Sequence, residues 1–178
     1  LFTALMTVQW ISAIPIIESY SDLSPDRIVL FNRIEQLVSP LTLITQLTLT
    51  YLVISYLGTS MILIVYGLLF IVVFLLYGLM PSVGVVVFSQ ALLRVFEYGI
   101  NKPSREIIYS QLKKKDRYKS TVFIDTFVTR FGDLTGSLFV GLGKILTISI
   151  TAVPLLAIPF AGIFSLTGYK ISKIFQQQ

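Results

Sequence analysis

The chain has 178 residues, of which 54% are hydrophobic and only 13% charged, with a mean hydropathy of +0.82 and a formal net charge of +5. This composition excludes an ordinary soluble globular domain, in which about a quarter of the residues are charged. The chain has no cysteine and no histidine, which excludes disulfides, thiolate or imidazole metal sites and histidine relays. We therefore predict an all-α polytopic membrane bundle, whose helices satisfy their backbone hydrogen bonds internally.

Six apolar stretches of spanning length follow one another, since a bilayer crossing takes about 20 apolar residues. The first covers residues 1–19. It has no basic segment and no cleavage site, so we expect a part of a longer polypeptide and no signal peptide. The second covers 24–57: a capping serine precedes Pro25 and Asp26, Gly58 suits its end, and Pro40 can kink it.

The remaining predicted spans are 59–79, 83–100, 120–146 and 149–174. The turn signal MPSVG separates the first two of these, and a polar linker, 101–120, separates the fourth and fifth spans of the chain.

Basic residues gather in this linker and in the C-terminal tail, at Lys102, Arg105, Lys113, Lys114, Lys115, Arg117, Lys119, Lys170 and Lys173. The opposite side offers Arg27 and Arg33 beside Asp22 and Asp26. The positive-inside rule therefore predicts a cytoplasmic linker and C-terminus. A solvated surface run and a site for anionic lipid headgroups are the alternatives. No nucleic-acid-binding motif accompanies the basic residues, so we expect no nucleic-acid partner.

Ionisable residues also occur within the predicted spans, at Arg94, Glu97, Asp125, Arg130, Asp133 and Lys144. Such groups are costly in lipid and normally face a bundle interior or a wet cavity. The spacing of three predicts the pairs Arg94–Glu97 and Arg130–Asp133. The alternative is that these residues clamp helix ends at the membrane boundary, and that Lys144 extends its ammonium outward to water.

Uncharged and charged polar residues occur along the second span, at Asn32, Arg33, Glu35, Gln36, Thr42, Thr45 and Gln46. Gln36 and Gln46 are ten apart, which we interpret as a return to nearly one face that also holds Arg33. This face lines a cavity or makes ordinary interhelical hydrogen bonds. In the fifth span, Gly132 and Gly136 form a GxxxG step that Gly143 continues, which predicts a closely packed neighbour.

Catalytic motifs are absent. FGDLTG resembles the GxGD of intramembrane aspartyl proteases, but Arg130 replaces the first glycine and no partner YD occurs. No Walker loop, GxSxG or metal-ligand cluster is present. We expect neither an enzyme nor a cofactor.

Two stretches, FNRIEQLVSPLTLITQLTLTYLVISYLG and NKPSREIIYSQLKKKDRYKSTVFIDTFVTRFGDLTGSLF, resemble the bacterial ATP:ADP antiporter (nucleotide translocase) family and its uncharacterised bacterial relatives, within the major facilitator superfamily. The resemblance covers essentially the whole chain. Its most specific parts are Pro103-Ser104-Arg105-Glu106, Tyr118-Lys119, Phe123-Ile124-Asp125-Thr126, Arg130 and Gly132-Asp133. The chain departs from the family before Gly58, where basic residues are missing, and near Ser39-Pro40, which lacks the usual Asn; Lys144 matches no motif.

The resemblance implies that residues 1–178 are the C-terminal six-helix half of a secondary transporter in the bacterial inner membrane. Such a carrier works by alternating access, with nucleotides or another organic anion as candidate solute. Its partners would be the lipid bilayer, an N-terminal six-helix half and the small-molecule solute. Proton coupling would need a carboxylate with a raised pKa, for which Glu35 and Glu97 are the options. The alternative function is a non-transporting receptor or scaffold with the same fold.

The site prediction has two parts. The candidate substrate pathway consists of Arg33, Glu35, Gln36, Gln46 and Lys144. The candidate cytoplasmic gate is an ion-pair network of Arg94, Glu97, Arg105, Glu106, Asp125, Arg130 and Asp133.

Overall fold

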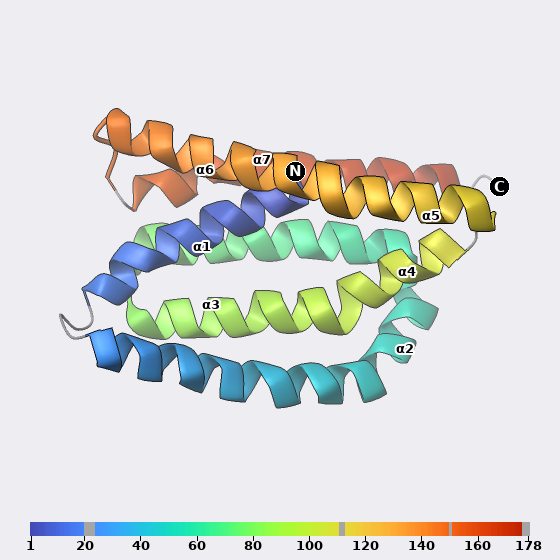
Figure 1. The fold of residues 1–178 in the computed structure, drawn as a ribbon, viewed down its shortest axis with the longest axis horizontal. Coiled ribbons are helices and arrows are strands. Elements are labelled where there is room, and N and C mark those ends of the chain that lie inside the picture. The colour runs from blue at the N-terminus through green and yellow to red at the C-terminus, as the bar shows by residue number, and fades with distance from the viewer. Residues whose placement is uncertain (20–23, 111–112, 150, 176–178) are drawn as a thin grey trace.

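The computed structural model describes residues 1–19, 24–110, 113–149 and 151–175, and every regular element among them is helical. The prediction of an all-α protein is therefore confirmed. The elements are α1 (Phe2–Glu18), α2 (Ser24–Leu79), α3 (Val83–Phe96), the π-helical η1 (Glu97–Asn101), α4 (Lys102–Ser110), α5 (Lys114–Phe123), the π-helical η2 (Ile124–Val128), α6 (Thr129–Ile145) and α7 (Ala152–Phe175). Successive rods run back and forth along one long axis (Figure 1).

Helix α2 consists of two rods that meet at Gly58. The backbone there has φ 72° and ψ 159°, a conformation that residues with a side chain rarely adopt. The predicted end of the second span is thus confirmed, whereas Pro40 lies within the helix without a break in its helical angles. The predicted turn around Asp22 lies outside the described residues, and Ser24, the predicted capping residue, is the first residue of α2.

The linker prediction needs a correction. Residues 102–110 continue the preceding helix as α4, and the next helix already begins at Lys114. The segment is rich in Lys, Arg, Glu and Gln, which are good helix formers. Its polarity therefore indicates a helix that extends beyond the apolar layer, and not a loop.

Four described helices are long and apolar enough to cross a membrane, by length and composition: Pro25–Tyr56, Met61–Leu79, Val83–Ile107 and Ala152–Lys170. These helices indicate a membrane-embedded protein. The prediction of six spans is therefore not confirmed. Phe2–Glu18 is apolar but shorter, and the rod containing α6, which carries Arg130, Asp133 and Lys144, is not among the four.

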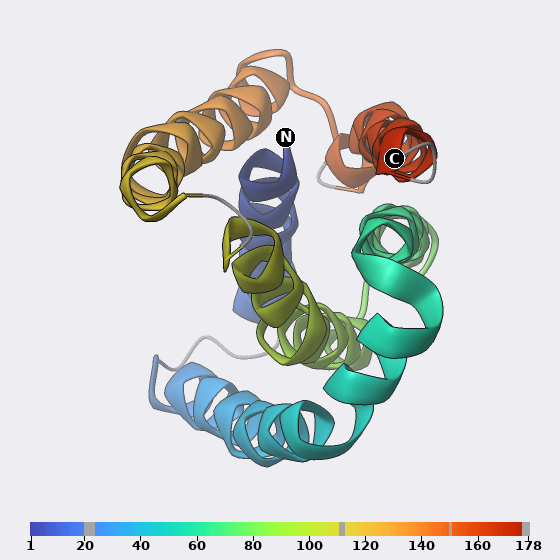
Figure 2. The same cartoon turned by 90° about the vertical axis from the view of Figure 1, so that its right-hand side faces the viewer.

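Helix α1 lies in the middle of the bundle, with α6, α7 and α3 around it (Figure 2). The second rod of α2 packs along α7, where Ser165 lies so close that a Cβ on Gly67 would approach it to 2.7 Å. Aromatic residues of that rod fill the core, with Tyr66, Phe70 and Phe74 fully buried. The second rod of α2 is therefore far better buried than the first, with 39% of its apolar stretch buried against 11%.

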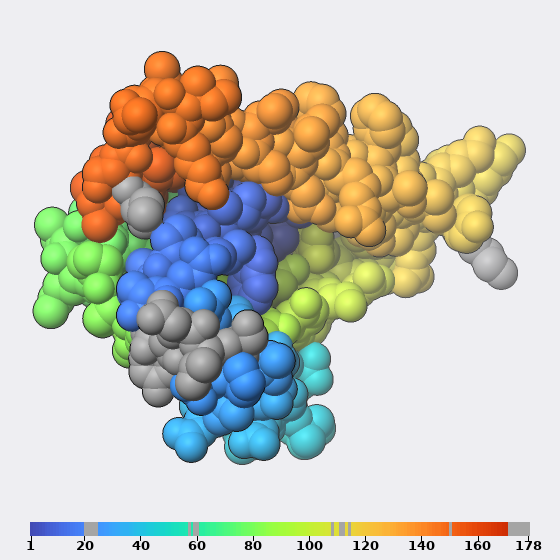
Figure 3. Space-filling model, turned by 60° about the vertical axis from the view of Figure 1, so that its left-hand side comes forward, coloured from blue at the N-terminus to red at the C-terminus, as the bar shows by residue number. Residues whose placement is uncertain are grey.

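Helix α6 packs on α1 through the predicted glycine step. A Cβ on Gly132 would overlap Thr3, and one on Gly136 would lie 2.6 Å from the Ala4 carbonyl oxygen. Close packing at this stripe is thus confirmed, and Gly143 meets Val153 of α7 in the same way. Helix α6 and the first rod of α2 form the margins of the bundle, with α1 between them on the face shown in Figure 3.

Candidate functional site

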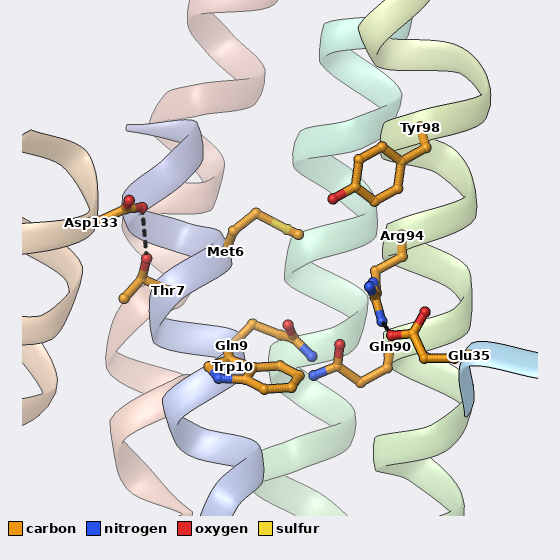
Figure 4. A pocket seen from close by; sticks show the side chains of 9 residues that line it. All are labelled: Met6, Thr7, Gln9, Trp10, Glu35, Gln90, Arg94, Tyr98 and Asp133. Atoms are coloured by element: carbon orange, nitrogen blue, oxygen red, sulfur yellow. Dashed lines mark hydrogen bonds and ion pairs between the residues drawn. The ribbon is translucent and has the colours of Figure 1, made fainter. Parts of the chain in front are cut away.

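A pocket of about 470 Å³ lies between α1 and α3 and opens to this face. We call it the central pocket. It is lined by Met6, Thr7, Gln9 and Trp10 of α1, Glu35 of α2, Gln90 and Arg94 of α3, Tyr98 of η1 and Asp133 of α6 (Figure 4). Polar side chains from five elements therefore converge between helices whose other surfaces are mainly apolar.

Three of these residues form a ladder on one side of the α3–η1 rod. Gln90, Arg94 and Tyr98 are spaced four apart, so they lie above one another. The helix starts where Ser82 accepts a hydrogen bond from the Val85 amide at 3.3 Å. This cap begins the helix within the MPSVG segment, at Val83.

Two glutamines face each other across the central pocket, and they differ in their partners (Figure 4). Gln9 is buried and its Nε2 donates to the Tyr77 hydroxyl at 2.8 Å. Gln90 is 2% exposed, and its Nε2 has no hydrogen-bond partner among the described residues. A buried donor without an acceptor is costly, so Gln90 is the side chain with an unfilled hydrogen-bonding capacity in this pocket.

Arg94 forms an ion pair with Glu35 through Nη1, and this contact links α3 to the first rod of α2. The predicted Arg94–Glu97 pair does not form. Glu97 is turned into the bundle, where it is 8% exposed and accepts from Asn101 Nδ2 at 2.5 Å and from Arg105 Nη2 at 3.2 Å. The pairing fails because Glu97 has partners on its own rod, Asn101 and Arg105, whereas Arg94 pairs across to α2.

The predicted Arg130–Asp133 pair is confirmed, with Nη1 and Oδ2 3.8 Å apart. Asp133 also accepts a hydrogen bond from Thr7 Oγ1 at 3.1 Å, which joins α6 to α1 at the edge of the central pocket. Arg130 points away from the bundle, with its side chain 82% exposed. The ion pair is therefore weak, and Thr7 is the partner that positions the carboxylate.

A second pocket of about 360 Å³, the side pocket, lies between the first rod of α2 and the α3–η1 rod. It is lined by Glu35, Val38, Ser39, Thr42, Leu43, Gln46, Arg94 and Tyr98. Glu35, Arg94 and Tyr98 border both pockets, so the Glu35–Arg94 pair stands between them.

The polar face predicted on the second span has a different register. Eleven residues make about three turns, so Glu35 and Gln46 share a face, whereas the ten residues from Gln36 to Gln46 leave the two almost a quarter turn apart. Gln36 is exposed and borders neither pocket. Arg33 borders a separate surface hollow with Asp26.

Lys144 is not brought into either pocket. It lies exposed in the last turn of α6, near Ser12 and Ile148. A cation at a helix C-terminus interacts favourably with the free carbonyls there, which accounts for its position.

The π-helical turn η1 explains how α2 is held beside the pockets. The Lys102 amide bonds to the Glu97 carbonyl, and Pro103 has no amide hydrogen to offer the carbonyls of Tyr98 and Gly99. Side chains of α2 take both: Gln46 Nε2 donates to the Tyr98 carbonyl at 3.0 Å, and Thr50 Oγ1 donates to that of Gly99. The π turn thereby docks the first rod of α2.

The predicted gate residues do not form one network. Besides the pairs already described, Arg117 meets Glu106 at 3.9 Å across the α4–α5 junction. Burial raises the pKa of the Tyr109 phenol; the nearby Arg105 cation opposes the rise, and Asp125 and Glu106 add to it. These charges therefore gather around the junction as separate, partly exposed contacts.

Several pocket residues escaped the sequence analysis, namely Met6, Thr7, Gln9, Trp10, Gln90 and Tyr98. The four-residue spacing of Gln90, Arg94 and Tyr98 is a signal that could have found the ladder. Gln9 and Trp10 carry no such periodic signal.

In the part of the chain that the structure describes, no group of three or more acidic, cysteine or histidine side chains is placed to hold a metal ion. Comparison with family models, curated proteins and solved structures finds no match to this chain.

Proposed function

We propose that this chain forms one half of a secondary transporter that moves an organic anion by alternating access. The proposal rests on the central pocket, where polar side chains converge inside a bundle of membrane-spanning length. Ionisable groups are tolerated at such a depth when they face a wet pathway or one another. The resemblance to the ATP:ADP antiporter family points in the same direction.

Arg94 and Gln90 are the residues proposed to bind the solute. Arg94 has Glu35 as its one polar partner among the described residues, so a guanidinium edge is left to bind an oxyanion. Gln90 Nε2, one turn away, needs an acceptor. Together they suit a carboxylate or phosphoryl group, and the rings of Trp10 and Tyr98 suit an apolar or aromatic remainder. A nucleotide has both parts.

Alternating access is proposed from the exposure of the marginal helices. Only 11% of the apolar stretch of Pro25–Tyr56 is buried, against 39% for Met61–Leu79. A carrier built from two rocking halves needs such a face, because the halves meet beside the central site. We propose that the contacts of Glu97, Arg105 and Arg117 near the α4–α5 junction close one of the two states.

The test is a flux assay on the natural full-length protein in liposomes. Labelled ATP, phosphate and succinate are offered with and without internal counter-solute and with and without a pH gradient. We expect uptake of at least one anion, and loss of that uptake in Arg94→Gln. The control Lys115→Gln, which removes an exposed cation from α5, should transport normally.

Dependence on counter-solute would indicate exchange, and dependence on the gradient would indicate proton coupling. Saturable binding without flux of any anion would contradict the transporter and favour the receptor. Equal uptake by Arg94→Gln and the unmodified protein would contradict the role of the central pocket.

A further inference from the structure

We infer that the Glu35–Arg94 ion pair is an exchangeable latch: the oxyanion of the solute replaces Glu35 on Arg94, and release of Glu35 opens the central pocket into the side pocket. The inference rests on the proposed function, because it assigns the chemistry of solute binding at the same site.

The first observation is the position of the latch. Glu35 and Arg94 border both the central and the side pocket, and Glu35 reaches across from the first rod of α2 (Figure 4). The ion pair, together with Tyr98, is therefore the lining that two hollows of about 470 and 360 Å³ share. When the pair breaks, we expect these hollows to join along the face of α2 that carries Glu35, Thr42 and Gln46.

The second observation is that the site already has room for a competing anion. Glu35 uses Nη1 of Arg94, and Gln90 Nε2 is buried, unpartnered and directed into the pocket. An oxyanion that accepts from Gln90 and from Arg94 satisfies a donor that Glu35 leaves empty. It also repels the Glu35 carboxylate, since two like charges a few ångströms apart in a poorly hydrated site repel strongly.

The third observation is that Glu35 can leave. Its side chain is 51% exposed, so the described residues leave it room to turn away from Arg94. The first rod of α2 stays docked further along, where Gln46 and Thr50 hold the carbonyls of η1. The side pocket moreover contains a buried hydroxyl, Thr42 Oγ1, that has no partner among the described residues and becomes wetted when the latch opens.

A cysteine at position 42 reports on the latch. Residues 1–178 contain no cysteine, so Thr42→Cys gives this chain one thiol, in the side pocket, and any cysteines elsewhere in the full-length protein are first replaced by serine. Its labelling rate with a water-soluble maleimide is measured in the full-length protein in detergent, in the presence of phosphate, succinate, ATP or uncharged adenosine. The phosphate and succinate arms distinguish phosphoryl from carboxylate chemistry.

We expect Glu35→Gln to raise the labelling rate about threefold in the absence of solute. The factor is small because a partly exposed ion pair contributes little free energy to keeping the latch closed. The control Glu18→Gln makes the same charge change at the exposed end of α1 and should leave the rate unchanged. With Glu35 present, at least one anion should raise the rate, and adenosine should not. Arg94→Gln should label fast and ignore every anion.

The latch is wrong if Glu35→Gln labels no faster than Glu18→Gln, and the exchange is wrong if no anion changes the rate. Flux on the same samples separates this inference from the transporter. If labelling responds to anions but no flux occurs, the latch is supported and the transporter function is contradicted. If flux occurs without a labelling response, only the latch is contradicted.

Discussion

At the scale of single residues, the two facing glutamines show how one residue type serves two purposes. Gln9 holds α1 to the second rod of α2 through Tyr77, whereas the buried Nε2 donor of Gln90 has no acceptor among the described residues. A polar group that folding leaves unsatisfied lowers stability, and a bound ligand that accepts from Gln90 would offset this cost.

Substituting each glutamine by leucine should separate these roles. Gln90→Leu removes the orphaned donor, so its free energy of unfolding should be equal or higher by about 1 kcal/mol while anion binding weakens. Gln9→Leu leaves the Tyr77 hydroxyl without its donor and should lose about 1–3 kcal/mol. Thermal unfolding in detergent measures the first effect, and anion-dependent labelling or flux measures the second. Equal destabilisation by both substitutions would contradict this division.

The π turn makes a second residue-level prediction. Thr50→Val removes a donor to the Gly99 carbonyl, which cannot receive the usual amide bond from four residues later because that residue is Pro103. We expect a loss of about 1–3 kcal/mol in unfolding free energy. Thr48→Val, two residues earlier, breaks only a bond to the exposed Ile44 carbonyl of its own helix and should be nearly neutral in the same melting experiment.

At the scale of elements, close approach of backbones decides how α6 is attached. The rod contacts α1 through Gly132 and Gly136, while Gly141 has open space where a Cβ would lie. Contacts of this kind depend on shape instead of hydrophobicity, because the surrounding lipid is as apolar as the helix face.

Gly136 and Gly141 therefore give a matched pair of substitutions. Gly136→Ala pushes a methyl group into the Ala4 carbonyl and Thr7, so α6 should separate from α1 at a cost of about 1–3 kcal/mol. Gly141→Ala adds the same methyl group in open space and should be neutral or stabilising by up to about 1 kcal/mol. Melting temperatures check both substitutions. Crosslinking between α1 and α6 measures their separation, and a shorter α1–α6 distance in Gly136→Ala would contradict the prediction.

At the scale of the whole molecule, burial is distributed unevenly. The rods of α7 and the second half of α2 pack against each other, while the first rod of α2 and α6 lie at the margins of the pocket face. The basic α4–α5 junction and the far end of α7 lie at one end of the bundle, and the MPSVG turn lies at the other (Figure 1).

This arrangement predicts membrane sidedness that can be measured. If the basic end is cytoplasmic, Lys115→Cys should resist an impermeant maleimide in intact cells and react after permeabilisation, whereas Met80→Cys should react in intact cells. Both positions are exposed, so access to the thiol depends on the side of the membrane alone. The reversed pattern would overturn the predicted orientation.

Much of the fold follows from local features of the sequence. Apolar length located the helices, Gly58 ended one of them, Gly132 and Gly136 marked a close contact, and the spacing of Arg130 and Asp133 predicted their pairing. Each of these depends on residues within a few positions of one another, so helix geometry alone suffices. The helices α4 and α5 within the polar linker were not predicted, because polarity distinguishes lipid from water and does not distinguish helix from loop.

The partners across helices were decided by the tertiary structure. Arg94 pairs with Glu35 and not with Glu97, Gln90 faces Gln9, and Lys144 lies away from both pockets. These outcomes depend on how each helix is rotated about its axis. In a soluble protein an apolar stripe reveals that rotation, but lipid and bundle interior are both apolar, so the sequence of a membrane helix carries little record of which face turns inward.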